Sequence, residues 1–138
     1  MIFVDTGAWF AMAVPSDQDH NMVAECFRQC TRPLLTTDYV VDETLTLLRA
    51  RGYEQRALAL GAEFFNGSIV TIHYLSEAEI RAAWAIFLNY TDKKWSFTDC
   101  TSKVVIDQLQ ITQAVSLDHH FRQFGNLAVM SQQSAPAH

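Results

Sequence analysis

Apolar residues follow two alternating patterns along the chain: short continuous runs, and longer segments in which they recur every three or four positions. Short continuous runs bounded by turn residues are typical of buried strands, and the recurring pattern is typical of helices that bury one face. We expect strands at 2–4, 34–37, 68–74, 114–117 and 127–130. We expect helices at 8–14, 16–30, 39–51, 54–65, 76–88 and 96–109, and a short turn or helix that carries Phe121 and Phe124.

Polar residues at the starts of these segments predict where helices begin. Ser76 with Glu79, and Ser96 with Asp99, have the spacing of capping boxes, and Ser16 is a predicted N-cap. The helix that Ser76 opens carries the clearest apolar stripe in the sequence. We expect this stripe to pack into the core; its members are Ile80, Ala83, Trp84, Phe87 and Leu88.

The alternation of strands and helices predicts an α/β fold in which a parallel sheet lies between layers of helices. A chain of 138 residues has the usual length of one domain, which we place at 1–130. Residues 131–138 are polar, and we expect them to form a disordered tail. In sheets of this kind, ligands bind beyond the carboxyl ends of the strands. The residues that follow each strand are therefore the first candidates for a functional site.

Composition narrows the class of protein. Hydrophobic residues make up 49% and charged residues 18%, which excludes an intrinsically disordered chain. The net charge of −5 disfavours nucleic-acid binding through bulk positive charge. No apolar stretch reaches the roughly 18 residues of a membrane span, and the amino terminus lacks the pattern of a signal peptide. Three cysteines are too few for a disulfide scaffold, so we expect a cytoplasmic protein.

Carboxylates gather at the predicted carboxyl edge of the sheet. Asp5 ends the first strand, Asp118 ends the fourth, and Asp99 lies in the first turn of the helix that leads to the fourth. Taken singly, each has a structural explanation, because Asp commonly caps turns and helices. Taken together, they would repel one another unless divalent cations neutralised them. All-oxygen ligands favour Mg²⁺ or Mn²⁺ over zinc.

Glu43 is the fourth candidate carboxylate. It shares one face of its predicted helix with Val40 and Leu47, because a helix turns by about 100° per residue. A carboxylate on an apolar face is costly unless a cation or strong hydrogen bonds satisfy it. A salt bridge to Arg28 or Arg81 is the structural alternative to a metal site.

The ordered set of these segments resembles the PIN-domain ribonucleases, and most of all the VapC-type toxins of toxin–antitoxin pairs. The resemblance implies a three-layer α/β/α sandwich with a five-stranded parallel sheet in the order 3-2-1-4-5. It maps the family's catalytic and metal-binding acids onto Asp5, Glu43, Asp99 and Asp118. It also implies an RNA substrate such as a tRNA, a small antitoxin that covers the acidic site, and a homodimer. The segments that carry it are Val4-Asp5-Thr6, Val41-Asp42-Glu43, Ser96-Phe97-Thr98-Asp99-Cys100 and Ser116-Leu117-Asp118-His119-His120-Phe121.

Four carboxylates suit one or two divalent ions for phosphodiester hydrolysis. We expect Asp5 and Asp99 to hold the principal ion, Asp118 to help a second, and Glu43 either to ligate or to orient the attacking water. Two ions would change the net charge from −5 to −1. The hydroxyls that would fix the carboxylate rotamers are those of Thr6 and Thr98.

Substrate contacts are predicted in the polar loop that precedes Ser96. Lys93 and Lys94 are candidates for binding phosphate, and Trp95 is a candidate for stacking on an unpaired base. The alternative is a solvated basic turn with Trp95 packed inward. Lys103 is a further candidate, and its alternative is a pair with a site carboxylate. Of the adjacent His119 and His120, we expect at most one to touch phosphate or metal, because their side chains face different ways.

Other interpretations remain open. A nuclease of the same fold would serve RNA processing without an antitoxin, and a non-catalytic module would bind RNA or protein. A signalling receiver domain would need adjacent acids after the first strand, whereas Thr6 and Gly7 follow Asp5. A haloacid-dehalogenase-like phosphatase would need Asp at position 7, which is glycine. His20, Cys26 and Cys30 show no fourth zinc ligand, and cysteines on an apolar helix face are usually core residues.

Overall fold

The computed structural model of the chain describes residues 1–130. Five strands form one parallel sheet in the order β3-β2-β1-β4-β5, as the resemblance implies. The polar tail expected at 131–138 lies outside the described residues. In chain order the elements are β1 (Ile2–Val4), α1 (Thr6–Ala13), α2 (His20–Gln29), β2 (Leu34–Thr37), α3 (Asp38–Ala50), α4 (Glu54–Asn66), β3 (Thr71–His73), α5 (Glu77–Asn89), α6 (Phe97–Gln108), β4 (Gln113–Val115), the 3-10 helix η1 (His119–Gln123) and β5 (Ala128–Met130).

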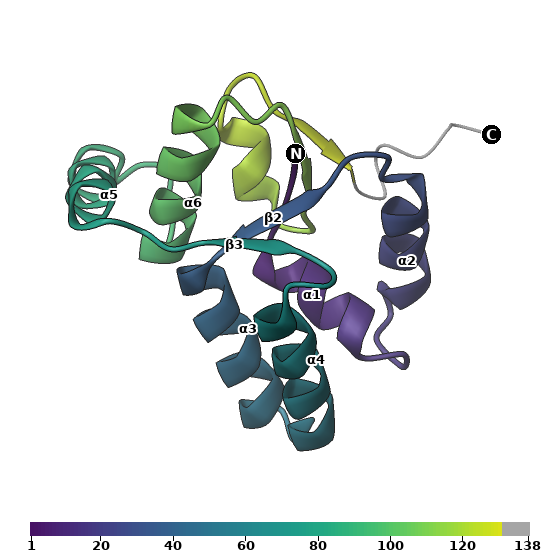
Figure 1. Cartoon of the computed structure of the whole chain (residues 1–138). Coiled ribbons are helices and arrows are strands. Elements are labelled where there is room, and N and C mark those ends of the chain that lie inside the picture. Colours follow the sequence, from purple (N-terminus) through teal and green to yellow (C-terminus); the bar gives the residue numbers. More distant parts are fainter. Residues whose placement is uncertain (131–138) are drawn as a thin grey trace.

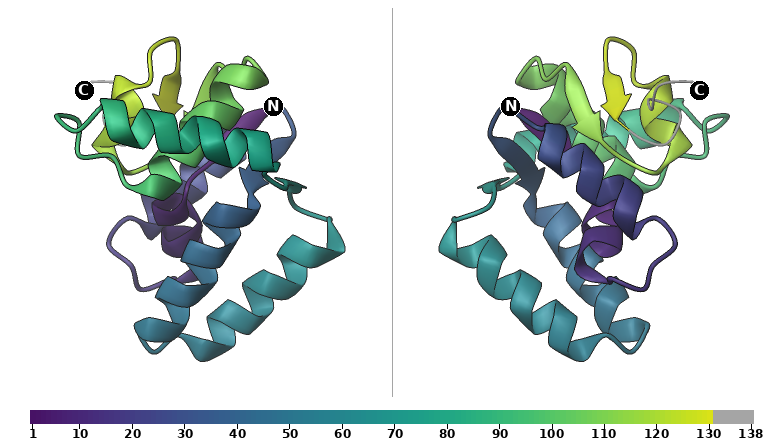
Figure 2. Two further views of the ribbon diagram at one scale, coloured as in Figure 1. Left: turned by 90° about the vertical axis from the view of Figure 1, so that its left-hand side faces the viewer. Right: turned by 90° about the vertical axis from the view of Figure 1, so that its right-hand side faces the viewer.

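The helices form layers around the sheet. α5 and α6 lie on one side of the strands and α2 lies on the opposite side, as the two views of Figure 2 show. α5 packs against α6 and lies outside it, at the edge of the molecule (Figure 1). α3 and α4 lie side by side and extend away from the sheet (Figure 1). None of the helices described is both long and apolar enough to cross a membrane.

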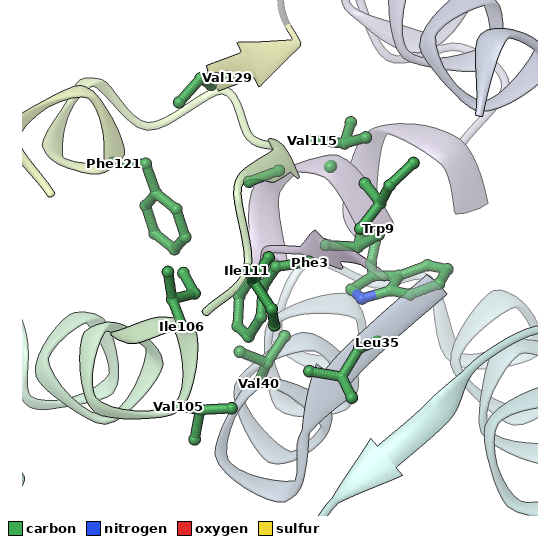
Figure 3. Packing of buried hydrophobic residues seen from close by; sticks show 14 of the residues in the cluster. Phe3, Trp9, Leu35, Val40, Val105, Ile106, Ile111, Val115, Phe121 and Val129 are labelled. Atoms are coloured by element: carbon green, nitrogen blue, oxygen red, sulfur yellow. The ribbon is translucent and has the colours of Figure 1, made fainter. Parts of the chain in front are cut away.

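The core forms where the central strands meet the helices. Phe3 on β1, Ile106 on α6 and Phe121 on η1 lie together there (Figure 3) and are almost fully buried. The rings of Phe3 and Phe121 are 5.9 Å apart. Burying side chains of this size contributes about 1.5–3 kcal/mol each. The core therefore fixes β1 and η1, the elements that Asp5 directly follows and Asp118 directly precedes.

Several predicted boundaries were wrong for local reasons. The helix expected from Ser16 begins at His20, because residues 15–19 form turns in which the Asp17 carboxylate accepts a hydrogen bond from the Asp19 amide. The strand expected at 68–74 is limited to 71–73, because Ser68 bonds back to Asn66 in a turn. The helix expected at 8–14 begins at Thr6, directly after Asp5.

The apolar stripe of α5 was also predicted wrongly. Ala83 is fully buried, but the side chains of Trp84, Phe87 and Leu88 are 52%, 41% and 54% exposed. α5 packs on α6 and not directly on the sheet, so only a narrow face of it is covered. The prediction of a core position therefore holds for Ala83, whereas Trp84, Phe87 and Leu88 form an exposed surface.

Candidate active site

The four predicted carboxylates converge on one pocket at the carboxyl edge of the sheet. The pocket has a volume of about 510 Å³, and Asp5, Glu43, Asp99 and Asp118 all line it. Asp5 follows β1 and Asp118 follows β4, and these strands are neighbours with Val4 opposite Val115. Glu43 comes from α3 and Asp99 from α6. Residues separated by up to 113 positions in the sequence are thus brought together by the strand order.

Asp5 is the most enclosed of these acids, with 5% of its surface exposed. It occupies the N-cap position of α1, and its Oδ2 accepts a 3.3 Å hydrogen bond from the Ser116 hydroxyl. The pKa of its carboxyl is raised from 3.8 to about 7: burial is the largest cause, the negative charges of Asp99, Asp118 and Glu43 add to the rise, and a hydrogen bond from the Thr6 amide opposes it. Asp5 is thus a buried acid whose charge lacks sufficient compensation from the protein.

Asp99 is held in place by the start of α6. Its Oδ2 accepts a 3.0 Å hydrogen bond from the Ser96 amide, and its own amide donates to the Ser96 hydroxyl at 3.0 Å. The capping box predicted from the sequence is therefore confirmed. Its position in the first helical turn places the carboxylate near the positive end of the α6 dipole. The neighbouring Cys100 is not a candidate nucleophile, because burial and the charge of Asp99 raise the pKa of its thiol to about 11.

Asp118 and Asp99 are bridged by His120, which the predicted site set did not include. The Nδ1 atom of His120 lies 2.9 Å from Asp99 Oδ2 and 3.3 Å from Asp118 Oδ1. Asp118 also caps η1 by accepting a hydrogen bond from the His120 amide at 2.9 Å. His119 is mostly exposed, with its Nδ1 3.8 Å from Asp118. The expectation that at most one of the two histidines takes part is met by His120; the only sequence signal for it was its adjacency to Asp118.

The two predicted threonines occupy different environments. Thr6 is buried, and its hydroxyl donates a 2.6 Å hydrogen bond to Glu43 Oε1, which fixes that carboxylate. Thr98 does not line the pocket; its carbonyl accepts a hydrogen bond from the Thr101 hydroxyl. Ser116 has the role expected of Thr98, because it donates to Asp5 and accepts from the Asp118 amide at 3.0 Å.

Only one of the predicted substrate-binding side chains reaches the pocket. Lys94 lines it, in a left-handed backbone conformation with φ of 58°. Lys93 lies 3.9 Å from Asp92, and Lys103 bonds to Asp107 at 2.8 Å instead of a site carboxylate.

One of the two expectations for Trp95 was that its ring would be exposed and would stack on a base. The ring is buried instead: Trp95 is 6% exposed and packs against Tyr90 and Phe124. Its Nε1 donates to the Gln123 side chain at 2.8 Å. The alternative of an inward-packed tryptophan is the correct one. Its indole belongs to the core because the loop turns at Lys94 directly before it.

The donor set fits a divalent cation. Four carboxylates line the pocket, whereas Lys94 is the one permanently charged cation among its described lining residues. Oxygen ligands of this kind are typical of Mg²⁺ and Mn²⁺ sites. One ligand atom each from Asp118, His119 and His120 also lie within 4.8 Å of one another. An added cation would neutralise the mutual repulsion that contributes to the raised pKa of Asp5.

Comparisons with known proteins identify relatives of similar length and fold. No protein-family model matches the chain. The chain is 29% identical over 129 residues to "23S rRNA-specific endonuclease VapC20" of Mycobacterium tuberculosis, covering 94% of this chain and 98% of that protein. It is 28% identical over 123 residues to "VapC ribonuclease" of Archaeoglobus fulgidus, covering 86% and 77% of the two chains.

Two solved structures share the fold. The crystal structure of M. tuberculosis VapC20, described as a sarcin-ricin loop cleaving toxin, has a TM-score of 0.85 at 26% identity and covers 91% of this chain and 95% of that one. FitAcB from Neisseria gonorrhoeae has a TM-score of 0.70 at 16% identity, with 98% and 100% of the chains covered. The second likeness supports the fold alone.

Proposed function

We infer that this chain, a VapC-type protein of the PIN-domain family, is a metal-dependent endoribonuclease that acts as the toxin of a toxin–antitoxin pair. The observation that carries the proposal is the convergence of Asp5, Glu43, Asp99 and Asp118 from four segments on one pocket. The sequence similarity to the M. tuberculosis protein named as an endonuclease extends over nearly the whole chain, and it supports the same activity. A binding module without catalysis would have no need for four mutually repelling carboxylates.

Each side chain has a role in the proposed hydrolysis. Asp5 and Asp99 would hold the principal Mg²⁺ or Mn²⁺ ion, and Asp118 would help to hold a second. When bound, the metal would polarise the scissile phosphate and make water a stronger nucleophile. Glu43, oriented by the Thr6 hydroxyl, would position the attacking water and accept its proton.

Two further residues prepare the site for phosphate. Lys94 presents a positive charge to the RNA backbone at the pocket. His120 holds Asp99 and Asp118 at a fixed separation through its Nδ1 atom. In the metal-free protein this bridge keeps the carboxylates of Asp99 and Asp118 close to each other. A cation that binds both needs them at this short separation.

The substrate we propose is a structured RNA. The named target of the M. tuberculosis relative is 23S rRNA, whereas the resemblance alone suggested tRNA. The proposed antitoxin is a small protein that covers the acidic pocket with a basic side chain. A homodimer is also proposed, with the exposed α4 side chains Leu58 and Phe65 as its candidate contact. Size-exclusion chromatography of the protein alone tests the dimer.

Cleavage of purified ribosomes and total tRNA tests the function, with Mg²⁺, Mn²⁺ and EDTA lanes run in parallel. Discrete fragments are expected with either metal and none with EDTA. Asp99→Asn should fold, because an amide oxygen still accepts the Ser96 hydrogen bond, but it should lose more than about 100-fold in rate. Asp107→Asn is the matched control, because Asp107 lies on the same helix and pairs with Lys103 away from the pocket.

Three results would contradict parts of the proposal. Full activity of Asp99→Asn would remove this residue from the site. Cleavage that persists in EDTA would exclude the metal mechanism. Failure of the folded wild-type protein to cut either RNA with either metal would overturn the nuclease assignment.

A further inference from the structure

A row of four aromatic side chains connects the active site to the outer surface of the molecule. We name this set, Tyr39, Phe97, Phe87 and Trp84, the aromatic strip. The ring centroids of Tyr39 and Phe97 are 6.1 Å apart, those of Phe97 and Phe87 5.9 Å, and those of Phe87 and Trp84 5.9 Å. Each ring therefore contacts the next, and the strip is continuous across α3, α6 and α5.

The strip begins beside the acidic pocket. Tyr39 precedes Glu43 by one turn of α3, so both lie on the same face of that helix. Phe97, in the first turn of α6, contacts the Tyr39 ring and continues the strip from there. The other end lies on α5, outside α6 and away from the sheet (Figures 1 and 2). The strip therefore offers a surface onto which a polymer with its reacting bond in the pocket can extend.

The outer rings of the strip, Phe87 and Trp84, are accessible to a planar ligand. Phe87 is 41% exposed and Trp84 is 52% exposed, and their planes differ by only 25°. Lys94 brings positive charge to the pocket from the loop after α5. Arg81, one turn before Trp84, has its side chain 77% exposed and forms a 3.5 Å ion pair with the similarly exposed Glu77. Exposed aromatic rings with neighbouring cations are typical of surfaces that bind unpaired nucleotides.

We propose that the aromatic strip binds unpaired bases of the RNA substrate by stacking, and so selects single-stranded loops over duplex RNA. The inference rests on the proposed nuclease function and specifies which surface outside the pocket holds the substrate. Bases in a duplex are already stacked on one another and cannot reach Trp84 and Phe87. The unusual exposure of these two rings is then explained by the ligand that covers them.

Cleavage kinetics with a short unstructured RNA tests the strip. Trp84→Ala and Phe87→Ala should each raise KM by about 5- to 100-fold, the usual range for loss of one base–aromatic stack, and leave kcat unchanged. Trp84→Phe should restore most of the loss, because a phenyl ring still stacks. Leu109→Ala removes a side chain of matched exposure, 42%, from the far end of α6 and should leave KM unchanged.

Tryptophan fluorescence gives a second readout. Trp9 and Trp95 are 3% and 6% exposed, so quenching by iodide reports mainly on Trp84. Adding the same RNA to the Asp99→Asn protein should protect this fluorescence from iodide, whereas duplex RNA of equal length should protect it less. Trp84→Phe should remove the iodide-sensitive part of the signal.

The outcomes separate this inference from the nuclease proposal. If the wild type cuts RNA and both alanine variants keep its KM, the strip does not bind substrate and only this inference fails. If the variants change the oligomeric state and not KM, the strip is a protein–protein interface and the inference also fails. If the wild type neither binds nor cuts any RNA, the proposed function itself is wrong and the inference falls with it.

Discussion

Lys94 carries an unusual backbone conformation at the active site. Its φ of 58° lies in the left-handed region, which costs a side-chain-bearing residue about 1 kcal/mol relative to glycine. The same conformation brings its side chain to the acidic pocket and turns the chain so that Trp95 enters the core. A strained backbone at Lys94 is thus what we expect if lysine is retained there for its positive charge.

Lys94→Gly separates the backbone cost from the charge. We expect the variant to unfold at a higher urea concentration, with a gain of up to about 1 kcal/mol, because glycine adopts this φ without strain. We also expect weaker RNA binding, with the slope of log KM against log salt smaller by about 0.7, the change for one lost phosphate contact on a single strand.

Arg32→Gln is the charge-matched control for this variant. Arg32 precedes β2, at the opposite end of the strand from the pocket, and it is exposed. Its loss changes the net charge equally and should leave the salt slope almost unchanged. An equal change of slope in both variants would mean that Lys94 acts only through net charge.

The residues of the site differed in how far the sequence could predict them. Asp5 and Glu43 were found from strand ends and helical periodicity, and both line the pocket. Ser116 was missed, and the sequence could not distinguish His120 from His119, because the partners of Ser116 and His120 come from other elements or depend on the turn after β4. Thr98 was predicted from adjacency to Asp99, but adjacent residues of a helix point in different directions.

At the scale of elements, two helices begin with the same capping box but in different places. In α5 the Ser76 hydroxyl accepts from the Glu79 amide at 3.1 Å, and in α6 the Ser96 hydroxyl accepts from the Asp99 amide at 3.0 Å. The acid of the first box bonds to His73, while the acid of the second lines the pocket. The pair therefore offers a matched test of what helix capping contributes to the site.

Ser96→Ala and Ser76→Ala should each lower the free energy of unfolding by about 1 kcal/mol, because each leaves one helical amide without its cap. Only Ser96→Ala should also weaken metal binding and activity, by about 10- to 100-fold, since the first turn of α6 positions Asp99. Urea unfolding and Mn²⁺ titration measure the two effects. Equal loss of metal affinity in both variants would show that capping acts through general stability.

The elements also show the limit of hydrophobic periodicity. Ile2–Val4 and Leu34–Thr37 were predicted at their observed bounds, because their runs are short and end at turn residues. The apolar stripe of α5 was real as a pattern, yet Trp84 and Phe87 are exposed. Periodicity indicates that one face of a helix is apolar; which element or ligand covers that face depends on the tertiary structure.

At the scale of the whole molecule, the acidic pocket links stability to pH. The pKa of Asp5 is raised from 3.8 to about 7, mainly by burial and further by the other three carboxylates. A raised carboxyl pKa means that the folded state binds a proton more tightly than the unfolded state. The stability that Asp5 contributes is therefore complete below about pH 4 and is lost as pH rises to about 7.

Asp5→Asn should remove the loss of stability that occurs between about pH 4 and pH 7. A shift of this size corresponds to about 4 kcal/mol at most, so the metal-free variant should be more stable than the wild type at pH 8, with the difference shrinking toward pH 4. The asparagine oxygen can still accept the Ser116 hydrogen bond, so the fold is preserved. Urea unfolding in EDTA across this pH range measures the effect, and Asp107→Asn is again the control.

A divalent cation should also change the stability of the fold, by stabilising the ionised form of Asp5 instead of the protonated form. Because it favours the ionised carboxylates, Mn²⁺ should stabilise the wild type at pH 8 by about 2.7 kcal/mol at 100 times its Kd, and far less at pH 5, where Asp5 is protonated. Asp5→Asn should lose most of this metal-dependent stabilisation while gaining metal-free stability. If the variant gained no stability at pH 8, the buried charge of Asp5 would not be the origin of the pH dependence. If Mn²⁺ stabilised wild type and variant equally, the ion would bind without Asp5, and the carboxylates would not act as one site.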